Sequence, residues 1–303
     1  MKEMIYSRLT DVMEKSRIKT EEPMKAHTTF RVGGPADFFV SVQSTEELKG
    51  ILDVCREEKL PYYVLGNGSN LLVGDKGYRG IIIQIYKDMN DVMAAGELLT
   101  VQAGALLSRI ANVAQAEGLA GFEFAAGIPG TLGGAVVMNA GAYGGEMKDV
   151  LEMVTVLTGD GEIRVLKKEE LELGYRTSII AKKGYIVLEA VIRLKKGNGA
   201  QIKARMEELK EQRVTKQPLE FASAGSTFKR PDGYFAGKLV QDAGLRGFQV
   251  GDAQVSEKHC GFVVNRGNAT AAEIVELMKQ VSDKVMAEFG VKLEPEVKRL
   301  GEF

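Results

Sequence analysis

Two glycine-rich runs have the residue types and spacing that could hold an anionic ligand. The first is Gly66-Asn67-Gly68-Ser69-Asn70, and the second is the stretch 121–145, with eight glycines in 25 positions. Glycine lets the backbone approach a ligand closely and turn several N–H groups toward it, so a pyrophosphate can be held without excess positive charge. The second run is longer than a turn requires. A helix crossing packed at close range explains it equally well from the residues alone.

Two common nucleotide-binding motifs are excluded. The run 66–70 lacks the third glycine of a Rossmann fingerprint, and strand-like residues 71–73 follow where that motif needs a helix. Gly237-Lys238 is followed by Leu239 instead of Ser or Thr, so it is not a Walker loop. Taken alone, the run 66–70 is typical of an ordinary turn.

Charge and rare residues exclude several protein classes. Lys+Arg 40 against Asp+Glu 41 gives a net charge of -1, so no global field attracts nucleic acid or an anionic membrane. With only Cys55, Cys260, His27 and His259, a disulfide framework, a structural zinc site and a multi-histidine centre are excluded. Charge is interleaved with apolar residues at the start, and no run of about 18 apolar residues follows. We expect a cytoplasmic protein without a metal, a nucleic-acid partner, an obligate protein partner or membrane insertion.

A β-α-β arrangement is predicted around the first run. Ser44 and Glu47 form a capping box that opens a helix, and Cys55 lies on the apolar face of that helix, where it is most simply a core residue. Strands are predicted at 38–42, 62–65, 71–73 and 81–85. The run 66–70 is therefore expected in a turn between two strands.

The pattern then repeats, and a last region follows. A strand at 98–103 precedes a helical stripe at 106–114, a hairpin is predicted around 159–161, and residues 187–194 close this unit. The charged segment 201–217 is interpreted as a solvated helix or a linker. Beyond it we expect a strand at 262–265, a helix from Thr270 to Gly290 and an extended tail.

Five motifs occur in an order and spacing that closely resemble those of one enzyme family. They are GNGSN at 66–70, AAGIPGTLGGAVVMNAGAYGGE at 125–146, GYRTS at 174–178, GSTFKRP at 225–231 and LEPEVKRLG at 293–301. Each motif is weak alone, but five in sequence argue against coincidence. The chain thus resembles the UDP-N-acetylenolpyruvoylglucosamine reductase family, flavoenzymes of bacterial peptidoglycan precursor synthesis, in its shorter subtype without an extra substrate-domain insertion.

The resemblance implies an α+β fold. The family has a two-subdomain FAD-binding region of vanillyl-alcohol-oxidase/PCMH type and a separate α+β C-terminal substrate domain. On this chain we expect the two FAD-binding subdomains at 1–88 and 89–200 and the substrate domain at 214–303, with the C-terminal tail returning to the active site.

The resemblance also implies non-covalent FAD as the cofactor and NADPH as the co-substrate. The family's flavin loops fall on the two glycine-rich runs. The residues implied to bind FAD are Gly66, Asn67, Gly68, Ser69, Asn70, Ala126, Gly127, Pro129, Gly130, Thr131, Gly133, Gly134, Asn139, Ala140 and Gly141.

The family's catalytic trio falls on Arg176, Ser226 and Glu296. NADPH reduces FAD, the reduced flavin delivers a hydride to the enolpyruvyl ether, and Ser226 donates a proton to give UDP-N-acetylmuramate. A guanidinium suits the developing carboxylate charge because it binds with two parallel hydrogen bonds. A protonated glutamic acid could hydrogen-bond the enol form. Spacing does not choose between Glu294 and Glu296, whereas the family match chooses Glu296.

Several residues are further candidates for the substrate. Its diphosphate needs positive partners, and basic residues gather after Pro218. The candidates for substrate binding are Tyr175, Lys229, Arg230, Lys238 and Arg246. His27 is interpreted as structural. Two alternatives remain: an FAD-dependent oxidase of the same fold, and a flavin-binding protein without turnover.

Overall fold

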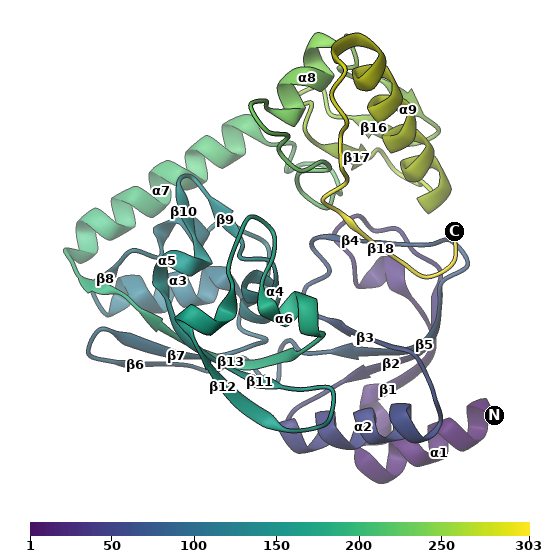
Figure 1. Cartoon of the computed structure of the whole chain (residues 1–303), viewed down its shortest axis with the longest axis vertical. Helices are drawn as coiled ribbons and strands as arrows, with labels where there is room; N and C mark the ends of the chain where they lie inside the picture. Colours follow the sequence, from purple (N-terminus) through teal and green to yellow (C-terminus); the bar gives the residue numbers. More distant parts are fainter. The chain divides into compact units, whose positions relative to one another are not determined.

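The computed structural model describes residues 1–303 and contains two compact units (Figure 1). The first unit comprises Met1–Ile18, Val40–Gly66 and Ile82–Arg213, and the second comprises Lys19–Phe39, Asn67–Ile81 and Val214–Phe303. Each unit is therefore assembled from segments distant in sequence. None of the helices combines the length and apolar character that crossing a membrane requires.

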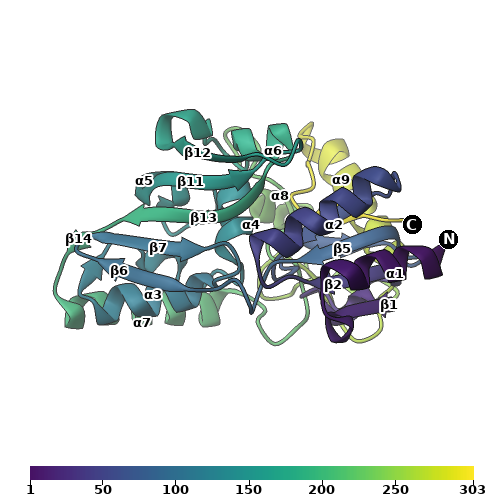
Figure 2. The same ribbon diagram turned by 90° about the horizontal axis from the view of Figure 1, so that it is seen from below.

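A five-stranded antiparallel sheet is the largest sheet of the first unit, and Figure 2 shows its strand order, β12-β11-β13-β7-β6. In this order the bounds are Ile163–Lys167, Leu151–Leu157, Ile186–Arg193, Leu98–Gln102 and Val92–Ala95. Val154, Ala190 and Val101 face one another across the three central strands and are at most 1% exposed. Their cross-strand packing forms the core of this sheet.

Short helices and hairpins surround this sheet. The helices are α3 (Leu107–Ala116), α4 (Leu132–Val137), α5 (Met147–Val150), α6 (Ile179–Lys183) and α7 (Gly199–Lys216), with 3-10 turns η3 (Glu123–Ala125) and η4 (Lys168–Leu171). Two small antiparallel pairs join β8 (Leu119–Ala120) with β14 (Lys195–Lys196) and β9 (Gly141–Ala142) with β10 (Gly145–Glu146).

The N-terminal region contributes helices and a second sheet. Its elements are α1 (Lys2–Val12), η1 (Lys15–Arg17), β1 (Ile18–Pro23), η2 (Met24–Ala26), β2 (Pro35–Ser41), α2 (Thr45–Glu57), β3 (Tyr62–Leu65) and β5 (Tyr78–Gln84). The four strands form a sheet of order β1-β2-β5-β3.

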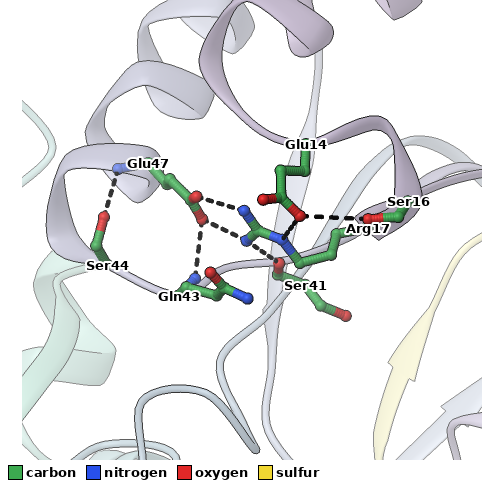
Figure 3. A network of polar contacts seen from close by, with 7 residues as sticks. All are labelled: Glu14, Ser16, Arg17, Ser41, Gln43, Ser44 and Glu47. Carbon is green, nitrogen blue, oxygen red and sulfur yellow. Dashed lines mark hydrogen bonds and ion pairs between the residues drawn. The ribbon is translucent and has the colours of Figure 1, made fainter.

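An ion pair fastens the segment after α1 to the start of α2 (Figure 3). The two terminal nitrogens of Arg17, Nη1 and Nη2, donate to the Glu47 carboxylate at 2.6 and 2.5 Å. Both side chains are less than one fifth exposed. The hydrogen bonds from Arg17 hold the pKa of Glu47 below its usual value. Glu47 N also donates to Ser44 Oγ at 3.1 Å, the predicted cap of this helix.

The second unit has its own apolar core. A three-stranded antiparallel sheet, β15-β16-β17 (Gln249–Val250, Ala253–Val255 and Val263–Asn265), belongs to this unit together with α8 (Ala236–Asp242) and α9 (Ala271–Phe289). The buried face of α9 carries Ile274, Leu277, Met278, Val281 and Val285. Asp75 fixes the start of this helix, because its carboxylate accepts hydrogen bonds from Ala271 N at 2.8 Å and Ala272 N at 2.9 Å.

The predicted cap residues Ser44 and Thr270 and most predicted strands are confirmed. The capping box predicted for Ser44 and Glu47 is only half formed, because the Glu47 carboxylate accepts from Gln43 N and Arg17 instead of from the Ser44 backbone. Thr270 caps α9, and Gly290 ends it at a φ of +67°. The segment interpreted as a solvated helix or linker is helix α7. Cys55 is 2% exposed, and burial raises the pKa of its thiol to about 12, so it is an inert core residue. Helices α4, α5, α6 and α8 were not predicted. The boundaries 1–88, 89–200 and 214–303 stay a prediction.

Candidate functional site

The second glycine-rich run folds as a loop followed by α4. Thr131 caps this helix, since its Oγ1 accepts a hydrogen bond from Gly134 N at 3.5 Å. Gly133 N donates to Ala103 O at 2.8 Å, and a Cβ on Gly133 would lie 3.2 Å from the Cβ of Ala103. Gly133 therefore serves close packing of α4 on the end of the neighbouring strand, which was one of the two interpretations of this run.

Gly66 brings the two runs together within the first unit. A Cβ at this position would lie 2.4 Å from Thr131 Oγ1, closer than real Cβ atoms come to another heavy atom. Residue 66 must therefore lack a side chain while Thr131 keeps its place. The contact sets the Thr131 hydroxyl beside the start of the first run, as a ligand site built from both runs requires.

The remainder of the first run belongs to the second unit. Gly68 has a φ of +62°, and a Cβ there would lie 2.0 Å from His27 O, so both conformation and space require glycine. Thr29 N donates to Gly68 O at 3.2 Å. His27 Nε2 lies 2.7 Å from Glu22 Oε1, and its ring stacks on Phe39 at 3.9 Å between centroids. These contacts support a structural role for His27.

The loop 126–130 is one accessible part of the second run. Ala126 N donates to Glu123 O at 3.2 Å, and Leu107 N donates to Gly130 O at 3.0 Å. Gly127 and Pro129 are exposed between these two bonds. Gly134, Tyr143 and Gly144 are exposed further along the same run.

The end of the second run is occupied by internal contacts. Gly141 pairs with Glu146 in the β9–β10 hairpin, and a Cβ on Gly141 would lie 2.7 Å from Gly145 O. Ala140 is 7% exposed and Asn139 is fully buried, with all of its side-chain amide bonded to protein partners. These three predicted FAD contacts therefore have clear roles in the fold.

Arg213 lies against the accessible loop and was not predicted. A Cβ on Gly127 would lie 3.1 Å from Cδ and 3.3 Å from Nη1 of Arg213. The side chain is half-buried in the last turns of α7 and has no carboxylate partner. Burial lowers the pKa of its guanidinium, although Tyr143 opposes that shift. An unpaired, partly desolvated cation beside a glycine loop is a candidate anion ligand.

Arg176 occupies a strained tight turn of the first unit. Gly174 and Thr177 exchange two backbone hydrogen bonds, of 3.1 and 3.3 Å, around Tyr175 and Arg176. Arg176 has a φ of +55°, a conformation that non-glycine residues adopt when their surroundings hold them there. Its guanidinium carbon lies 5.0 Å from the Tyr175 ring centroid. The turn thus presents a cation and an aromatic ring together.

Ser226 and Glu296 come together in the second unit through backbone pairing. Ser226 pairs with Phe262, and Glu296 N donates to Thr227 O at 2.8 Å. Lys229 N donates to the carbonyl of residue 294 at 2.8 Å, which continues the ladder. Ser226 is exposed and Glu296 is half-buried. Two members of the predicted trio are therefore fixed on adjacent extended segments of one unit, and Arg176 belongs to the other unit.

The last residue of the first run contacts this ladder. Asn70 Nδ2 donates to Glu296 O at 3.3 Å, and Lys298 N donates to Asn70 O at 3.0 Å. Beyond them β4 (Leu71–Val73) pairs in parallel with β18 (Lys298–Leu300). Asn67 and Ser69 are half-buried in the same loop. The C-terminal tail thus forms a strand beside the end of the first glycine-rich run, and its return to an active site stays a prediction.

The four basic candidates for the substrate diphosphate have partners within the second unit. Lys229 pairs with Glu294 at 3.2 Å, and Lys238 forms an ion pair with Asp242 one turn along α8. Arg246 donates to Gln241 Oε1 at 2.6 Å and to the carbonyl of residue 257. The guanidinium carbon of Arg230 lies 4.0 Å from the ring centroid of Phe235.

One cavity of the second unit, with a volume of about 300 Å³, contains none of the predicted residues. It is lined by Glu220, Phe221, Gln254, Ser256, Glu257, Lys258, Val264 and Arg266. Its charged side chains are of both signs, and Lys258 lies 3.8 Å from Glu220. It offers no convergent set of groups for the predicted chemistry.

Comparisons with known proteins assign the family. Residues 36–167 match the FAD binding domain family, and residues 217–300 match the family described as UDP-N-acetylenolpyruvoylglucosamine reductase, C-terminal domain. The reductase of that name from Clostridioides difficile is 53% identical over 98% of each chain, and that from Agathobacter rectalis is 52% identical over 100% of each. The crystal structure of the Thermus caldophilus reductase is similar, with a TM-score of 0.80 and 41% identity over 92% of this chain and 97% of that one.

These findings confirm the predicted fold class, an α+β protein with an FAD-binding region and a separate C-terminal domain. They also confirm that the chain is an oxidoreductase of the flavoenzyme type. Similarity at this level extends over the whole chain, beyond the five motifs. The chain belongs to the UDP-N-acetylenolpyruvoylglucosamine reductase family.

Proposed function

We propose that this protein reduces the enolpyruvyl group of UDP-N-acetylglucosamine enolpyruvate to give UDP-N-acetylmuramate, with NADPH as the reductant, in the cytoplasm, for peptidoglycan precursors. The observation that carries the proposal is more than 50% identity with reductases of that name over nearly the full length of both chains. The matched length spans the five motifs that hold the candidate site residues.

The first unit supplies residues that fit FAD. Bound FAD supplies a carrier that accepts a hydride from NADPH and passes it to the substrate. The second glycine-rich run and the start of the first, which meet where Gly66 lies against Thr131, would hold FAD non-covalently through main-chain groups. Arg213 would face the anionic diphosphate of FAD, since a guanidinium forms charge-assisted hydrogen bonds with phosphate oxygens. Its lack of a carboxylate partner supports this assignment.

Arg176 would hold the substrate carboxylate. Hydride addition to an enol ether conjugated to a carboxylate builds negative charge on that carboxylate, and a fixed cation stabilises it. A guanidinium binds both carboxylate oxygens in parallel, which an ammonium does not do. The positive φ of Arg176 supports a functional role because such strain is retained where a side chain must point in one direction. Tyr175 would lie beside the same substrate group.

Ser226 would donate the proton to the carbon that bears the carboxylate. Its exposure and its fixed backbone suit a donor to a bound substrate. Glu296, in its protonated form, would hydrogen-bond the enol form of the intermediate. The hydrogen bond between Glu296 N and Thr227 O supports a joint role for the two residues. Lys229, Arg230, Lys238 and Arg246 remain candidates for the substrate diphosphate, and each would exchange its present contact for phosphate.

A spectral titration tests the proposed function. Purified protein should show the absorbance of bound flavin, bleached anaerobically by NADPH and restored by the enolpyruvyl sugar nucleotide. Restoration only by air would identify an oxidase, and no bleaching would identify a flavin-binding protein without turnover. Yellow colour in the acid-precipitated protein would contradict non-covalent binding.

A further inference from the structure

Asn139 uses its whole side-chain amide inside the protein. It is 0% exposed and has a φ of +45°. Nδ2 donates to Glu146 Oε2 at 2.6 Å and to Gly174 O at 3.1 Å, and Oδ1 accepts from Lys148 N at 2.8 Å. The two N–H groups and the carbonyl are thereby satisfied, and a flipped amide would oppose all three partners. Both N–H groups of the side chain are therefore used by protein acceptors.

One of these bonds reaches the turn that carries Arg176. Gly174 is the first residue of that turn and accepts the Asn139 hydrogen bond on its carbonyl oxygen. A second link holds the other end, where Ser178 Oγ donates to Val137 O at 2.6 Å. Ser178 is fully buried and also caps α6. The turn is therefore tied at both ends to residues 137–139 of the second glycine-rich run.

The tip of the turn needs such support. Arg176 is held at a positive φ, and Tyr175 is 54% exposed. A strained residue keeps its conformation only while the surrounding structure fixes it. Because the turn has just two residues between Gly174 and Thr177, a shift of Gly174 changes the direction of the Arg176 side chain.

We propose that Asn139 is a positioning residue that acts through Arg176 and is not an FAD ligand. Its amide fixes Gly174 relative to the second run and so sets the direction in which Arg176 points. This inference rests on the proposed function, in which Arg176 holds the substrate carboxylate. It replaces our sequence-based expectation that Asn139 binds the cofactor.

Half-reaction kinetics of two variants test this proposal. Asn139→Gly removes the amide and tolerates the positive φ, and Asn139→Asp keeps the size and the acceptor but loses the donor. Both should slow flavin reoxidation by the enolpyruvyl substrate about 10- to 100-fold, the scale expected for small misplacements. The dissociation constant of FAD and the rate of flavin reduction by NADPH should change less than about threefold. Asn90→Ala, a partly exposed amide of the same unit, is the matched control.

A double-mutant cycle separates positioning from general damage. In an Arg176→Lys background, Asn139→Gly should slow reoxidation less than about twofold further, because a residue that acts through another has no independent effect. Fully additive losses would overturn the proposal, as would equal losses in both half-reactions. If the dissociation constant of FAD rises by the same factor as the reoxidation rate falls, Asn139 is an FAD ligand and the proposal is wrong.

Hydrogen exchange gives a readout that does not depend on the reaction. Asn139→Gly should speed amide exchange at 174–178 and leave the loop 67–70 unchanged. If exchange at 174–178 is faster in Asn139→Gly but the enolpyruvyl substrate does not reoxidise the flavin of the wild-type protein, the proposed function is refuted. The role of Asn139 in anchoring the turn would still stand. Unchanged exchange at 174–178 would refute the positioning role itself.

Discussion

The turn of Arg176 and the ladder of Ser226 and Glu296 are held in place by different means. The turn is closed by two backbone bonds of its own and is tied to the second glycine-rich run by side chains, namely the amide of Asn139 and the hydroxyl of Ser178. The ladder depends on backbone pairs, in which Thr227 bonds to Gly261 on one side and to Glu296 on the other. Single side-chain substitutions should therefore displace the first region, whereas the second should tolerate them unless the backbone loses a donor.

The largest effect is expected from Ser226→Ala. Because the backbone holds residue 226, loss of the hydroxyl should remove chemistry without moving the segment. Reoxidation of flavin by the enolpyruvyl substrate should slow about 10²- to 10⁴-fold, the range of general acid catalysis, with flavin reduction by NADPH nearly unchanged. Stopped-flow absorbance of each half-reaction measures this. Similar losses in both halves would contradict the assignment of Ser226.

Thr227→Pro should break the ladder itself. It removes the N–H that donates to Gly261 O at 2.9 Å, and a paired backbone group left without its partner costs about 1–3 kcal/mol. Thr227→Ala is the control, because it loses only the hydroxyl that accepts from Val263 N at 2.8 Å. Urea denaturation of both variants should show the proline variant as clearly less stable. Equal midpoints would mean that backbone pairing does not support this region.

Arg213→Gln should weaken FAD binding without moving the turn or the ladder. A charge-assisted hydrogen bond contributes about 1.5–3 kcal/mol, so the dissociation constant of FAD should rise about 10- to 100-fold. Flavin fluorescence titration measures it, and the loss should shrink at high salt. Arg205→Gln on the same helix, where Arg205 pairs with Glu208 at the surface, should leave the affinity unchanged. Unchanged affinity in both variants would remove Arg213 from the site.

The smallest effect is expected from Glu47→Gln, far from both regions in sequence. Arg17 lowers the pKa of Glu47, so the carboxylate stabilises the fold above its unfolded-state pKa and loses that effect as the pH falls through the folded-state value. The variant should lose about 1–2 kcal/mol of unfolding free energy at pH 7.

The pH dependence and a control sharpen this last test. The difference from wild type should shrink as the pH falls below the ordinary glutamate pKa of about 4.3. Glu57→Gln, which breaks an exposed pair with Arg8, should cost less unfolding free energy than Glu47→Gln, because solvent screens an exposed pair. A loss for Glu47→Gln that is independent of pH would show that the charge of Glu47 is not what stabilises this contact.

Local signals in the sequence predicted the elements with strong caps and periodicity. Ser44 and Thr270 opened their helices as expected because their side chains bond to the first turn. Helix α4 was not predicted, since Leu-Gly-Gly-Ala-Val-Val has poor helix propensity and depends on Thr131 and on packing against Ala103. Helix α4 therefore forms because of tertiary contacts and not because of local propensity.

The candidate site was predictable only where motifs were known. The motifs indicated Arg176, Ser226 and Glu296, but they did not separate residues that face a ligand from those that hold the loops. Arg213 lies in a charged helix, where one arginine without a partner carries no signal in sequence. Asn139 was grouped with the cofactor residues because its hydrogen-bond partner, Gly174, is 35 residues away along the chain. Such contacts appear only after folding.

The pairing of β4 with β18 has a consequence for synthesis. Residues 71–73 meet their strand partner only when residues 298–300 have been made, so the second unit cannot complete its fold until late in translation. All segments of the first unit are available once residue 213 has left the ribosome. During the interval between these two events, the ribosome-bound chain carries the strand at 71–73 with an unpaired edge.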